Sequence, residues 1–413
     1  MNEKLQEEVA ILYKNKAAKA ISIAQKLKNI TYIKNIIDTC TTFLNSSKFY
    51  ETKLDSNTHI FAFNNCLFDF HLNTIRNIQP EDYIFTTTGY DYVEEINEEI
   101  ENEIWNFFKS VYPNENMMYY IFDGFVLAMN PERPTQEFYT LTGNGSNGKS
   151  LIAAFIQYAF GNYAIMLNPA TITRPPQRAN ETTELIQTKG KRFVYVNEAP
   201  SGTDNKLQTS ILKTMAGNVT EMIKARDLYA TSIQFNIQFV TYLIYNDNPQ
   251  LSSAEPAVAR RLRIIDHKVK FIENAPEDNE FVKPINTNLP TLFSKPEYYI
   301  TFVQMLLKRW TETVCHYTCL KQPQEVIDKS KEYIDDNNEV LGWVFEDYEK
   351  TNDDKNIISS SDLFNSFKSR TKSTMTASVF KNRMEEIGFK WKKTNKGNVF
   401  QFITNKDVPD DIN

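Results

Sequence analysis

A glycine-rich octapeptide carries the clearest chemical signature in this sequence of 413 residues. It reads Gly143-Asn144-Gly145-Ser146-Asn147-Gly148-Lys149-Ser150 and matches the pattern G-x-x-x-x-G-K-S. Glycines let consecutive backbone N–H groups turn toward an anion, Lys149 can neutralise the β- and γ-phosphates, and the Ser150 hydroxyl can bind Mg²⁺. The octapeptide therefore predicts a site for a nucleoside triphosphate and Mg²⁺.

The octapeptide also has the flanking elements that such a site needs. An apolar run at 138–141 predicts a strand before it, and 151–160 predicts a helix after it, so the glycines lie at a helix N-terminus. Further strands are predicted at 193–196, 239–245 and 262–265. Strands separated by helical segments predict an α/β fold with a parallel sheet, whose strands are covered on both faces.

Three polar positions at the ends of these strands are candidate partners of the phosphate site. Glu198 follows the strand at 193–196 and could hold the metal and polarise water, although a strand that ends in glutamate is common. Asn246 could read the γ-phosphate or orient water, or it could close a strand as part of an Asn-Pro turn. Arg260 and Arg261 could form a solvated edge or supply an arginine finger.

The composition excludes several classes of protein. The chain is 41% hydrophobic and 13% aromatic, so it is neither collagen-like nor wholly disordered. Its formal net charge of -6 gives no global basic character, so a nucleic acid must be met by a local patch. Four cysteines and no secretory leader favour a soluble, intracellular protein, and the apolar run at 151–160 is too short to cross a membrane.

The rest of the chain predicts four domains. Helices are expected from Glu3 to about Leu44, strands at 59–63 and 83–87, and helical segments at 104–130 and 292–348. We expect a mixed N-terminal domain at 1–100, a nucleotide-binding core with its helical lead-in at 101–285, a helical region at 286–350 and a terminal module at 351–413.

The terminal module has the order of a winged helix. Apolar spacing predicts helices around 363–367 and 379–387, and 390–393 with 399–402 predict a hairpin. Basic residues gather on its expected exposed side: Lys368, Arg370, Lys372, Lys381, Arg383, Lys390, Lys392, Lys393 and Lys396. This cluster favours DNA binding, and the alternative is a protein-binding winged helix with a solvated basic face.

The segment from Cys315 to Cys319 could suggest a zinc site. No second ligand cluster accompanies it, and His59, His71 and His267 lie far apart in the sequence. We therefore predict two buried thiols on one face of a helix.

The ordered set of motifs resembles the superfamily 3 helicases, and within them the poxvirus-type primase–helicase branch. The matching residues are the octapeptide, Val196-Asn197-Glu198, Asn246-Asp247-Asn248-Pro249, and Glu255 with Ala259-Arg260-Arg261-Leu262-Arg263. The resemblance extends over most of residues 40–403. It includes Phe61 to Asp69, Pro80 to Tyr83, Gly89 to Tyr92, Val326 to Tyr348 and Ser361 to Phe364.

The resemblance implies an AAA+ ATP-dependent DNA helicase of viral or mobile-element replication. Such proteins form rings, usually hexamers, that move 3′→5′ on single-stranded and forked DNA in the host cytoplasm or a viral replication site. Many members carry a primase domain upstream, for which this chain has no room, so we expect either a stand-alone helicase or the helicase half of a longer protein. A separate primase or polymerase is a candidate partner.

The resemblance also assigns roles. Lys149 and Ser150 bind phosphate and Mg²⁺, Glu198 polarises water, and Asn246 senses the γ-phosphate. Arg260 or Arg261 acts on the ATP of a neighbouring subunit. Lys224 and Arg226 fall in the segment expected to hold the DNA-contacting pore hairpin.

Two other functions use the same loop. An initiator or loader would bind DNA and use ATP as an assembly switch without unwinding, and it shares most of these motifs. A phosphotransferase is disfavoured, because it gives no reason for the arginine pair or the basic terminal module.

Overall fold

The computed structural model describes residues 3–44, 49–132, 136–174, 183–197, 206–226, 232–276, 279–395 and 397–406. The chain divides into two compact units, residues 1–54 and 55–413. The predicted domain boundaries at 100, 285 and 350 fall inside the second unit and stay predictions.

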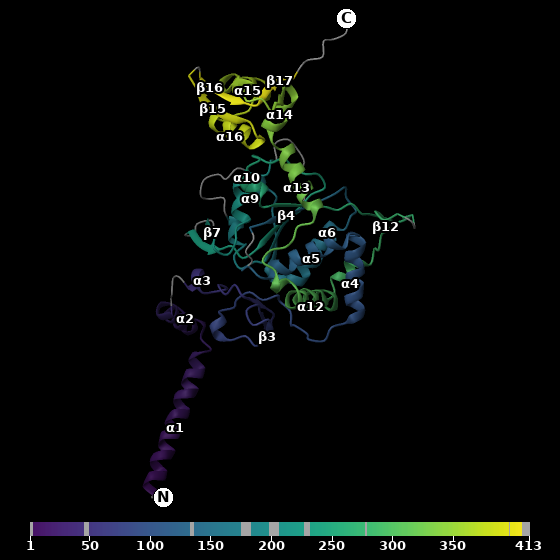
Figure 1. The fold of residues 1–413 in the computed structure, drawn as a ribbon. Helices are drawn as coiled ribbons and strands as arrows, with labels where there is room; N and C mark the ends of the chain where they lie inside the picture. The colour runs from purple at the N-terminus through teal and green to yellow at the C-terminus, as the bar shows by residue number, and fades with distance from the viewer. Residues whose placement is uncertain are drawn as a thin grey trace. The chain divides into compact units, whose positions relative to one another are not determined.

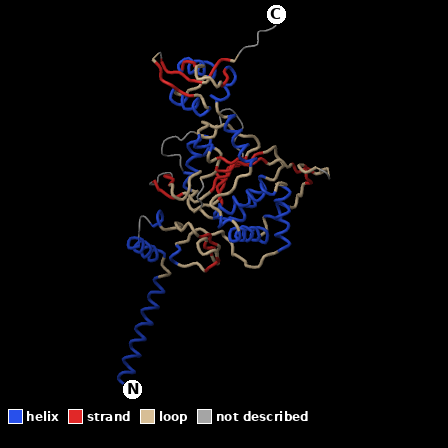
Figure 2. The backbone as a smooth tube through the Cα atoms, in the orientation of Figure 1, coloured by secondary structure: helices blue, strands red, loops and turns tan. Residues whose placement is uncertain are grey.

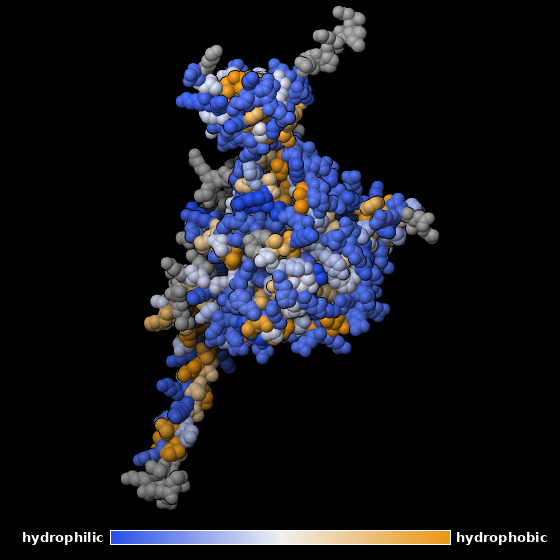
Figure 3. Space-filling view, viewed as in Figure 1, coloured by the Kyte–Doolittle hydropathy of each residue, from blue (hydrophilic) through white to orange (hydrophobic). Residues whose placement is uncertain are grey.

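The first unit is helical, as predicted. Its helices are α1 (Glu3–Lys26), α2 (Ile30–Leu44) and α3 (Phe49–Thr52). The Asn29 side chain begins α2 by accepting the backbone N–H of Thr31 at 2.9 Å. Apolar side chains of α1 are exposed, among them Leu12, Tyr13 and Ile21, and Figure 3 shows apolar residues along this helix.

The second unit begins with a small antiparallel sheet. Its strands are β1 (Ile60–Ala62), β2 (Leu67–Asp69) and β3 (Thr74–Arg76), so the strand predicted at 59–63 is confirmed.

The strand predicted at 83–87 is wrong. Tyr83 has a left-handed φ of 49° after the 3₁₀ turn η1 (Pro80–Asp82), and Asp55 Oδ1 accepts the N–H groups of Phe85 and Thr86. Those N–H groups are therefore not available for a strand ladder.

Two helices replace the single helical segment predicted at 104–130. They are α4 (Glu98–Val111) and α5 (Glu115–Met129), and Pro113 lies between them. Asn97 and Asn114 begin α4 and α5 respectively, because each side chain accepts an N–H group of the first helical turn.

The centre of the second unit is a five-stranded parallel sheet (Figures 1 and 2). Its strands, in spatial order, are β10 (Leu262–Asp266), β4 (Phe138–Thr142), β9 (Val240–Ile244), β6 (Phe193–Asn197) and β5 (Ala164–Leu167). The parallel α/β sheet and all four predicted strands are therefore confirmed. The edge strand β5, half exposed along most of its length, was missed.

The sheet has an apolar core on each face, which explains why its strands do not alternate between apolar and polar residues. On one face, Tyr139 of β4 packs in a cluster with α6 (Lys149–Phe160) and α12 (Pro296–Glu312). On the other face, Phe138 packs in a cluster with α9 (Thr209–Met215) and α13 (Gln324–Asp336).

The predicted order of helix, helix and hairpin is present near the C-terminus. Helices α14 (Glu339–Asp347), α15 (Ser360–Thr371) and α16 (Ala377–Ile387) share an apolar core with a sheet ordered β14 (Ile357–Ser359), β16 (Gly397–Gln401) and β15 (Lys390–Thr394). The remaining elements are η2 (Gly161–Tyr163), α7 (Ala170–Thr173), α8 (Thr183–Ile186), β7 (Met222–Arg226), β8 (Ser232–Asn236), α10 (Pro256–Ala259), β11 (Lys270–Ile272), β12 (Val282–Pro284), α11 (Leu289–Phe293), η3 (Val314–His316), β13 (Tyr348–Lys350) and β17 (Ile403–Asn405).

Within the described part of the chain, we find no helix that combines the length and the apolar character needed to cross a membrane.

Candidate nucleotide-binding site

The glycine-rich loop (residues 143–150) joins the C-terminal end of β4 to the first turn of α6. Gly143 has a φ of 135°, and a Cβ atom there would lie 2.5 Å from the carbonyl oxygen of His267, so no other residue fits. Gly148 begins α6 with a φ of 86°. The loop therefore turns tightly at the N-terminal, electropositive end of a twelve-residue helix.

Two buried side chains inside the loop fit a polyphosphate. Lys149 is 3% exposed, and its Nζ donates to Gly143 O at 2.5 Å and to Asn147 Oδ1 at 2.9 Å. Nδ2 of Asn147 is buried with no hydrogen-bond partner among the described residues. An unused donor beside a buried ammonium group is suited to an anion, because phosphate oxygens can satisfy both.

The loop opens into a cavity of about 1010 Å³. Asn246, two residues after β9, lines the same cavity as Lys149 and Ser150, so the structure brings these predicted residues together. The remaining walls come from α4, which contributes Asn106 and Phe107, from Phe271 of β11, and from the segment 283–292, which contributes Asn286 and Asn288. No motif marks these walls, and sequence reasoning missed them.

Glu198, the predicted metal ligand and water-polarising residue, lies outside the described residues. Asn197, which precedes it, ends β6 and pairs in register with Ile244 of β9. Oδ1 of Asn197 is buried without a hydrogen-bond partner in the described structure.

The arginine pair lies at the opposite end of the sheet from the loop. Leu262, which follows Arg261, pairs in parallel register with Phe138, five positions before Gly143. At about 3.3 Å per residue, this places the arginines about 17 Å from their own phosphate loop. An arginine side chain is much shorter than this, so neither guanidinium can reach the loop of its own chain.

The two arginines have different surroundings. Arg261 is 7% exposed and donates to Ala257 O at 3.0 Å and to Gln136 Oε1 at 2.9 Å. Arg260 is exposed, and no hydrogen bond or ion pair of its guanidinium is found among the described residues. Of the two arginines, Arg260 is therefore the one whose side chain is accessible from outside the molecule.

Gln136 links the arginine pair to the hairpin of β7 and β8. Its amide accepts from Arg261 and donates to Glu221 Oε1, and Glu221 directly precedes β7. Lys224 and Arg226 lie on the exposed face of β7, whereas Ile223 and Ala225 face the core.

Six of the nine basic residues predicted on the exposed side of the terminal module are exposed, and Lys396 lies outside the described residues. Lys390, Lys392 and Lys393 are exposed on the edge strand β15. Lys381 is half-buried, with Nζ 3.6 Å from the centre of the Trp391 ring. The predicted exposure of Arg383 is wrong, because this side chain is 7% exposed and pairs with Glu386 at 3.0 Å.

His267 packs against the start of the glycine-rich loop, a role that the sequence did not suggest. Its backbone N–H donates to Thr142 O at 2.8 Å, and Tyr112 Oη lies 2.6 Å from Nε2. Complete burial, reinforced by the charge of Lys149, lowers the pKa of His267 to about 3. The imidazole is therefore neutral at neutral pH, so it adds no positive charge beneath Lys149.

We expect His267 to make the second unit sensitive to acid. Between about pH 6.5 and pH 3 the unfolded chain binds a proton at His267 and the folded chain does not, so stability falls as the pH is lowered through this window. The loss is about 1.4 kcal/mol per pH unit, or about 2 kcal/mol at pH 5. Urea unfolding at pH 7 and pH 5 measures it. His267→Gln should remove this part of the pH dependence and the exposed control His316→Gln should not. An equal dependence in all three proteins would contradict this account.

Cys315 and Cys319 are free, but they are not two buried thiols of a helix. Cys315 is half-buried in the 3₁₀ turn η3, and Cys319 is exposed beyond it. That part of the prediction is wrong because the helix α12 ends at Glu312.

Comparisons with known proteins find relatives named as putative helicases and primases of large DNA viruses. Residues 1–123 match the family described as "D5 N terminal like". The chain is 29% identical over 263 residues to "Putative helicase L207/L206" of Acanthamoeba polyphaga mimivirus, which covers 63% of this chain and 27% of the relative. It is 29% identical over 145 residues to "Putative primase C962R" of African swine fever virus, which covers 34% of this chain and 14% of the relative.

The chain thus spans about a quarter or less of the length of these curated relatives. Among solved structures, the A-form apo structure of the NrS-1 C-terminal region aligns over 84% of this chain and 82% of that chain, with 11% identity and a TM-score of 0.42. The family match and the named viral relatives confirm the resemblance predicted from the motifs.

Proposed function

Because this chain is related to the D5-type primase–helicases of large DNA viruses, we propose that it is an ATP-dependent DNA helicase motor of viral or mobile-element replication. One observation carries the proposal. Lys149 and Asn246 line one cavity, whereas Arg260 lies at the far end of the sheet, exposed and out of reach of that cavity. A complete catalytic site therefore needs two copies of the chain.

We propose that these copies form a closed ring, a hexamer by analogy with the family, that moves 3′→5′ on single-stranded DNA. A head-to-tail interface that closes sets Arg260 of each subunit beside the nucleotide of the next one. The strand order supports an AAA+ core, because the loop strand β4 lies between β10, which follows the arginines, and β9, which precedes Asn246.

ATP is held in this proposal by the loop. The backbone of residues 143–148 and the Lys149 ammonium bind the phosphates, and Ser150 with Glu198 would hold Mg²⁺. The metal neutralises charge on the β- and γ-phosphates. Asn246 contacts the γ-phosphate from the end of β9, and Arg260 from the next subunit stabilises the charge that develops during hydrolysis.

Two surfaces contact DNA in this proposal. Lys224 and Arg226 on β7 face the pore, and the link from Arg261 through Gln136 to Glu221 couples that hairpin to the subunit interface. In the terminal module, Lys390, Lys392 and Lys393 on β15 contact DNA phosphates. Glu385 and Glu386 are exposed on α16, which favours contact through the strand over contact through the helix.

Dilution tests the central claim. ATP turnover per subunit on forked DNA should be constant at high protein concentration and should fall steeply below the concentration at which rings dissociate, with strand separation falling in parallel. Light scattering on the same samples reports assembly. Full turnover by a monomer would overturn the ring, and ATP-dependent assembly without strand separation would indicate an initiator or loader.

A further inference from the structure

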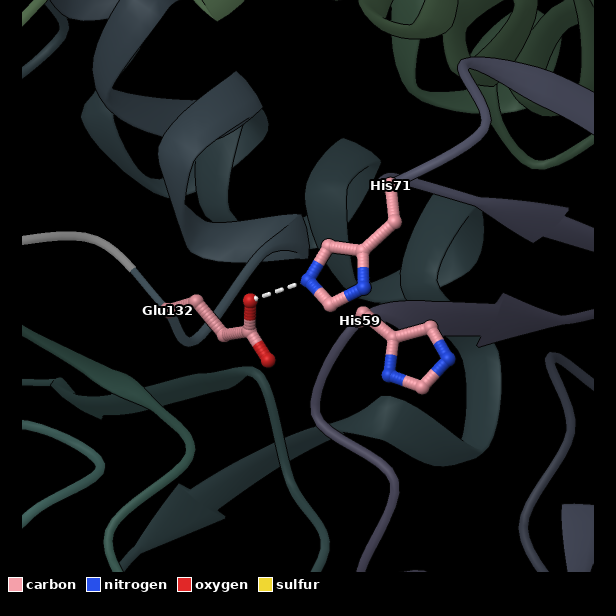
Figure 4. Close-up of side chains that lie close together, drawn as sticks. All are labelled: His59, His71 and Glu132. Carbon is pink, nitrogen blue, oxygen red and sulfur yellow. Dashed lines mark hydrogen bonds and ion pairs between the residues drawn. The ribbon is translucent and has the colours of Figure 1, made fainter.

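Two histidines twelve residues apart in the sequence, His59 and His71, meet at one end of the small sheet. His59 precedes β1 and His71 follows β2, and the antiparallel register pairs Ile60 with Asp69. Phe70 N donates to His59 O at 2.8 Å, which closes this end of the hairpin. Glu132 approaches from the turn after α5, as Figure 4 shows.

The three side chains offer one ligand atom each within 4.8 Å of one another. His71 Nε2 lies 2.7 Å from Glu132 Oε2, and the imidazole rings of His59 and His71 stack at 4.4 Å between centres, 7° from parallel. Thr58 Oγ1 donates to the other carboxylate oxygen of Glu132 at 2.5 Å. A neighbouring hydroxyl therefore orients the carboxylate, as supporting groups do around metal ligands.

The surrounding charge favours a cation. His59 lies within electrostatic range of Asp69, Asp82 and Glu132. Arg76 neutralises part of this charge, because it pairs with Asp69 at 3.0 Å and Asp82 at 2.8 Å. When both imidazoles are neutral, as metal ligands are, three carboxylates and one guanidinium leave two negative charges in excess.

Glu132 is ionised in these surroundings. Burial raises the pKa of its carboxyl group, but hydrogen bonds from Thr58 and His71 and the charges of the imidazoles outweigh burial, so the pKa lies below its ordinary value. The carboxylate is therefore ready to act as a ligand at neutral pH.

We propose that His59, His71 and Glu132 bind a divalent d-block cation, with Zn²⁺ as its representative. Two imidazole nitrogens and one carboxylate oxygen suit zinc and its neighbours, whereas Mg²⁺ and Ca²⁺ prefer oxygen ligands. The cation takes the place of the proton between His71 Nε2 and Glu132 Oε2. The two rings are stacked in this structure, so the His59 ring would have to turn before a nitrogen of each ring could bind the same cation. Water occupies the fourth position.

Such a cation would fasten the small sheet to the segment that leads into the loop strand β4. His59 and His71 belong to the sheet, and Glu132 lies six residues before Phe138, the first residue of β4. Without a cation, His71 and Glu132 form an ion pair between exposed groups, and such a pair contributes little to the stability of the folded chain. The proposal does not rest on helicase function, and its readout needs no nucleotide.

Zinc binding to the full chain tests the proposal. Protein stripped of metal with EDTA is titrated with ZnCl₂ in competition with a coloured chelator, at pH 7.5 and without nucleotide. We expect one equivalent bound at this site in the wild type and its loss in His59→Ala and His71→Ala. Thr58→Val keeps all three ligands and should weaken binding about 10–100-fold through the carboxylate alone. Excess Mg²⁺ should not compete.

Matched controls exclude other zinc ligands. His316→Ala removes an exposed histidine elsewhere, and Cys315→Ser with Cys319→Ser removes two free thiols, and both should retain the equivalent. If His71→Ala does not fold, Glu132→Gln, which is nearly isosteric, gives the same test. Equal zinc affinity in wild type and ligand variants, or loss of the equivalent only with the cysteines, would overturn the proposal.

Discussion

Lys149→Ala is expected to reduce ATP hydrolysis at least about a hundredfold and to abolish strand separation. Lys149 is 3% exposed in the glycine-rich loop, and its ammonium group is held by Gly143 O and Asn147 Oδ1, which are weak partners beside a triphosphate. Removing one preorganised charge from a site that stabilises a transition state costs about 10²–10³ in rate. Steady-state ATP turnover and a forked-duplex assay measure the two effects.

A second lysine variant controls for general effects of the substitution. Lys109→Ala makes the same change on α4, which also lines the cavity, but Lys109 is exposed and is not a lining residue. It should hydrolyse ATP at the wild-type rate. Full turnover by Lys149→Ala would remove the nucleotide site from the glycine-rich loop. If Lys149→Ala lost strand separation but kept normal DNA-stimulated ATP turnover, Lys149 would not be needed for hydrolysis and would act only in unwinding.

The central sheet and its loop could be predicted because their signals are local. Apolar runs mark β4, β6, β9 and β10, and each is buried along most of its length between two apolar clusters. The glycine-rich loop follows from residue types at fixed spacing, and the register of parallel strands then places Asn246 beside it. Sequence order is enough for this step because parallel strands end at the same edge of a sheet.

Other features depend on contacts that the sequence does not reveal. The segment 83–87 has strand composition, but a distant carboxylate, Asp55, accepts its N–H groups. Arg383 looks like a surface residue of a basic module, yet it is buried and pairs with Glu386. His59 and His71 meet only because β1 and β2 form a hairpin, so a hairpin prediction for 60–69 was the signal that could have found the pair.

For the arginine pair, one part could be predicted from the sequence and the other depends on contacts in the fold. The motif predicted that Arg260 or Arg261 acts across an interface, and its residues do not distinguish the two. Burial does, because Arg261 is held by Ala257 and Gln136, and withdrawing it from these contacts would leave their polar groups without partners. Arg260 has an exposed guanidinium at the same end of β10 and loses nothing comparable when it moves to a neighbour. We therefore propose that Arg260 is the finger and that Arg261 positions it.

Arg260→Ala is expected to bind ATP normally and to lose about 10³-fold or more in hydrolysis, the effect of removing an arginine finger. Single-turnover hydrolysis in assembled rings measures the loss. Mixing distinguishes action in trans from action in cis, because a Lys149→Ala subunit still carries Arg260 and can complete the site of an Arg260→Ala neighbour. Mixed rings should therefore hydrolyse ATP faster than either variant alone, while staying below the wild-type rate if the subunits fire in sequence. Arg261→Ala is expected to have a different defect. Arg261 contacts Gln136, and Gln136 contacts Glu221 beside β7, so ATP hydrolysis by this variant should no longer respond to DNA. Mixtures no faster than the two parents, or an Arg260→Ala ring that hydrolyses normally, would require another residue to complete the site.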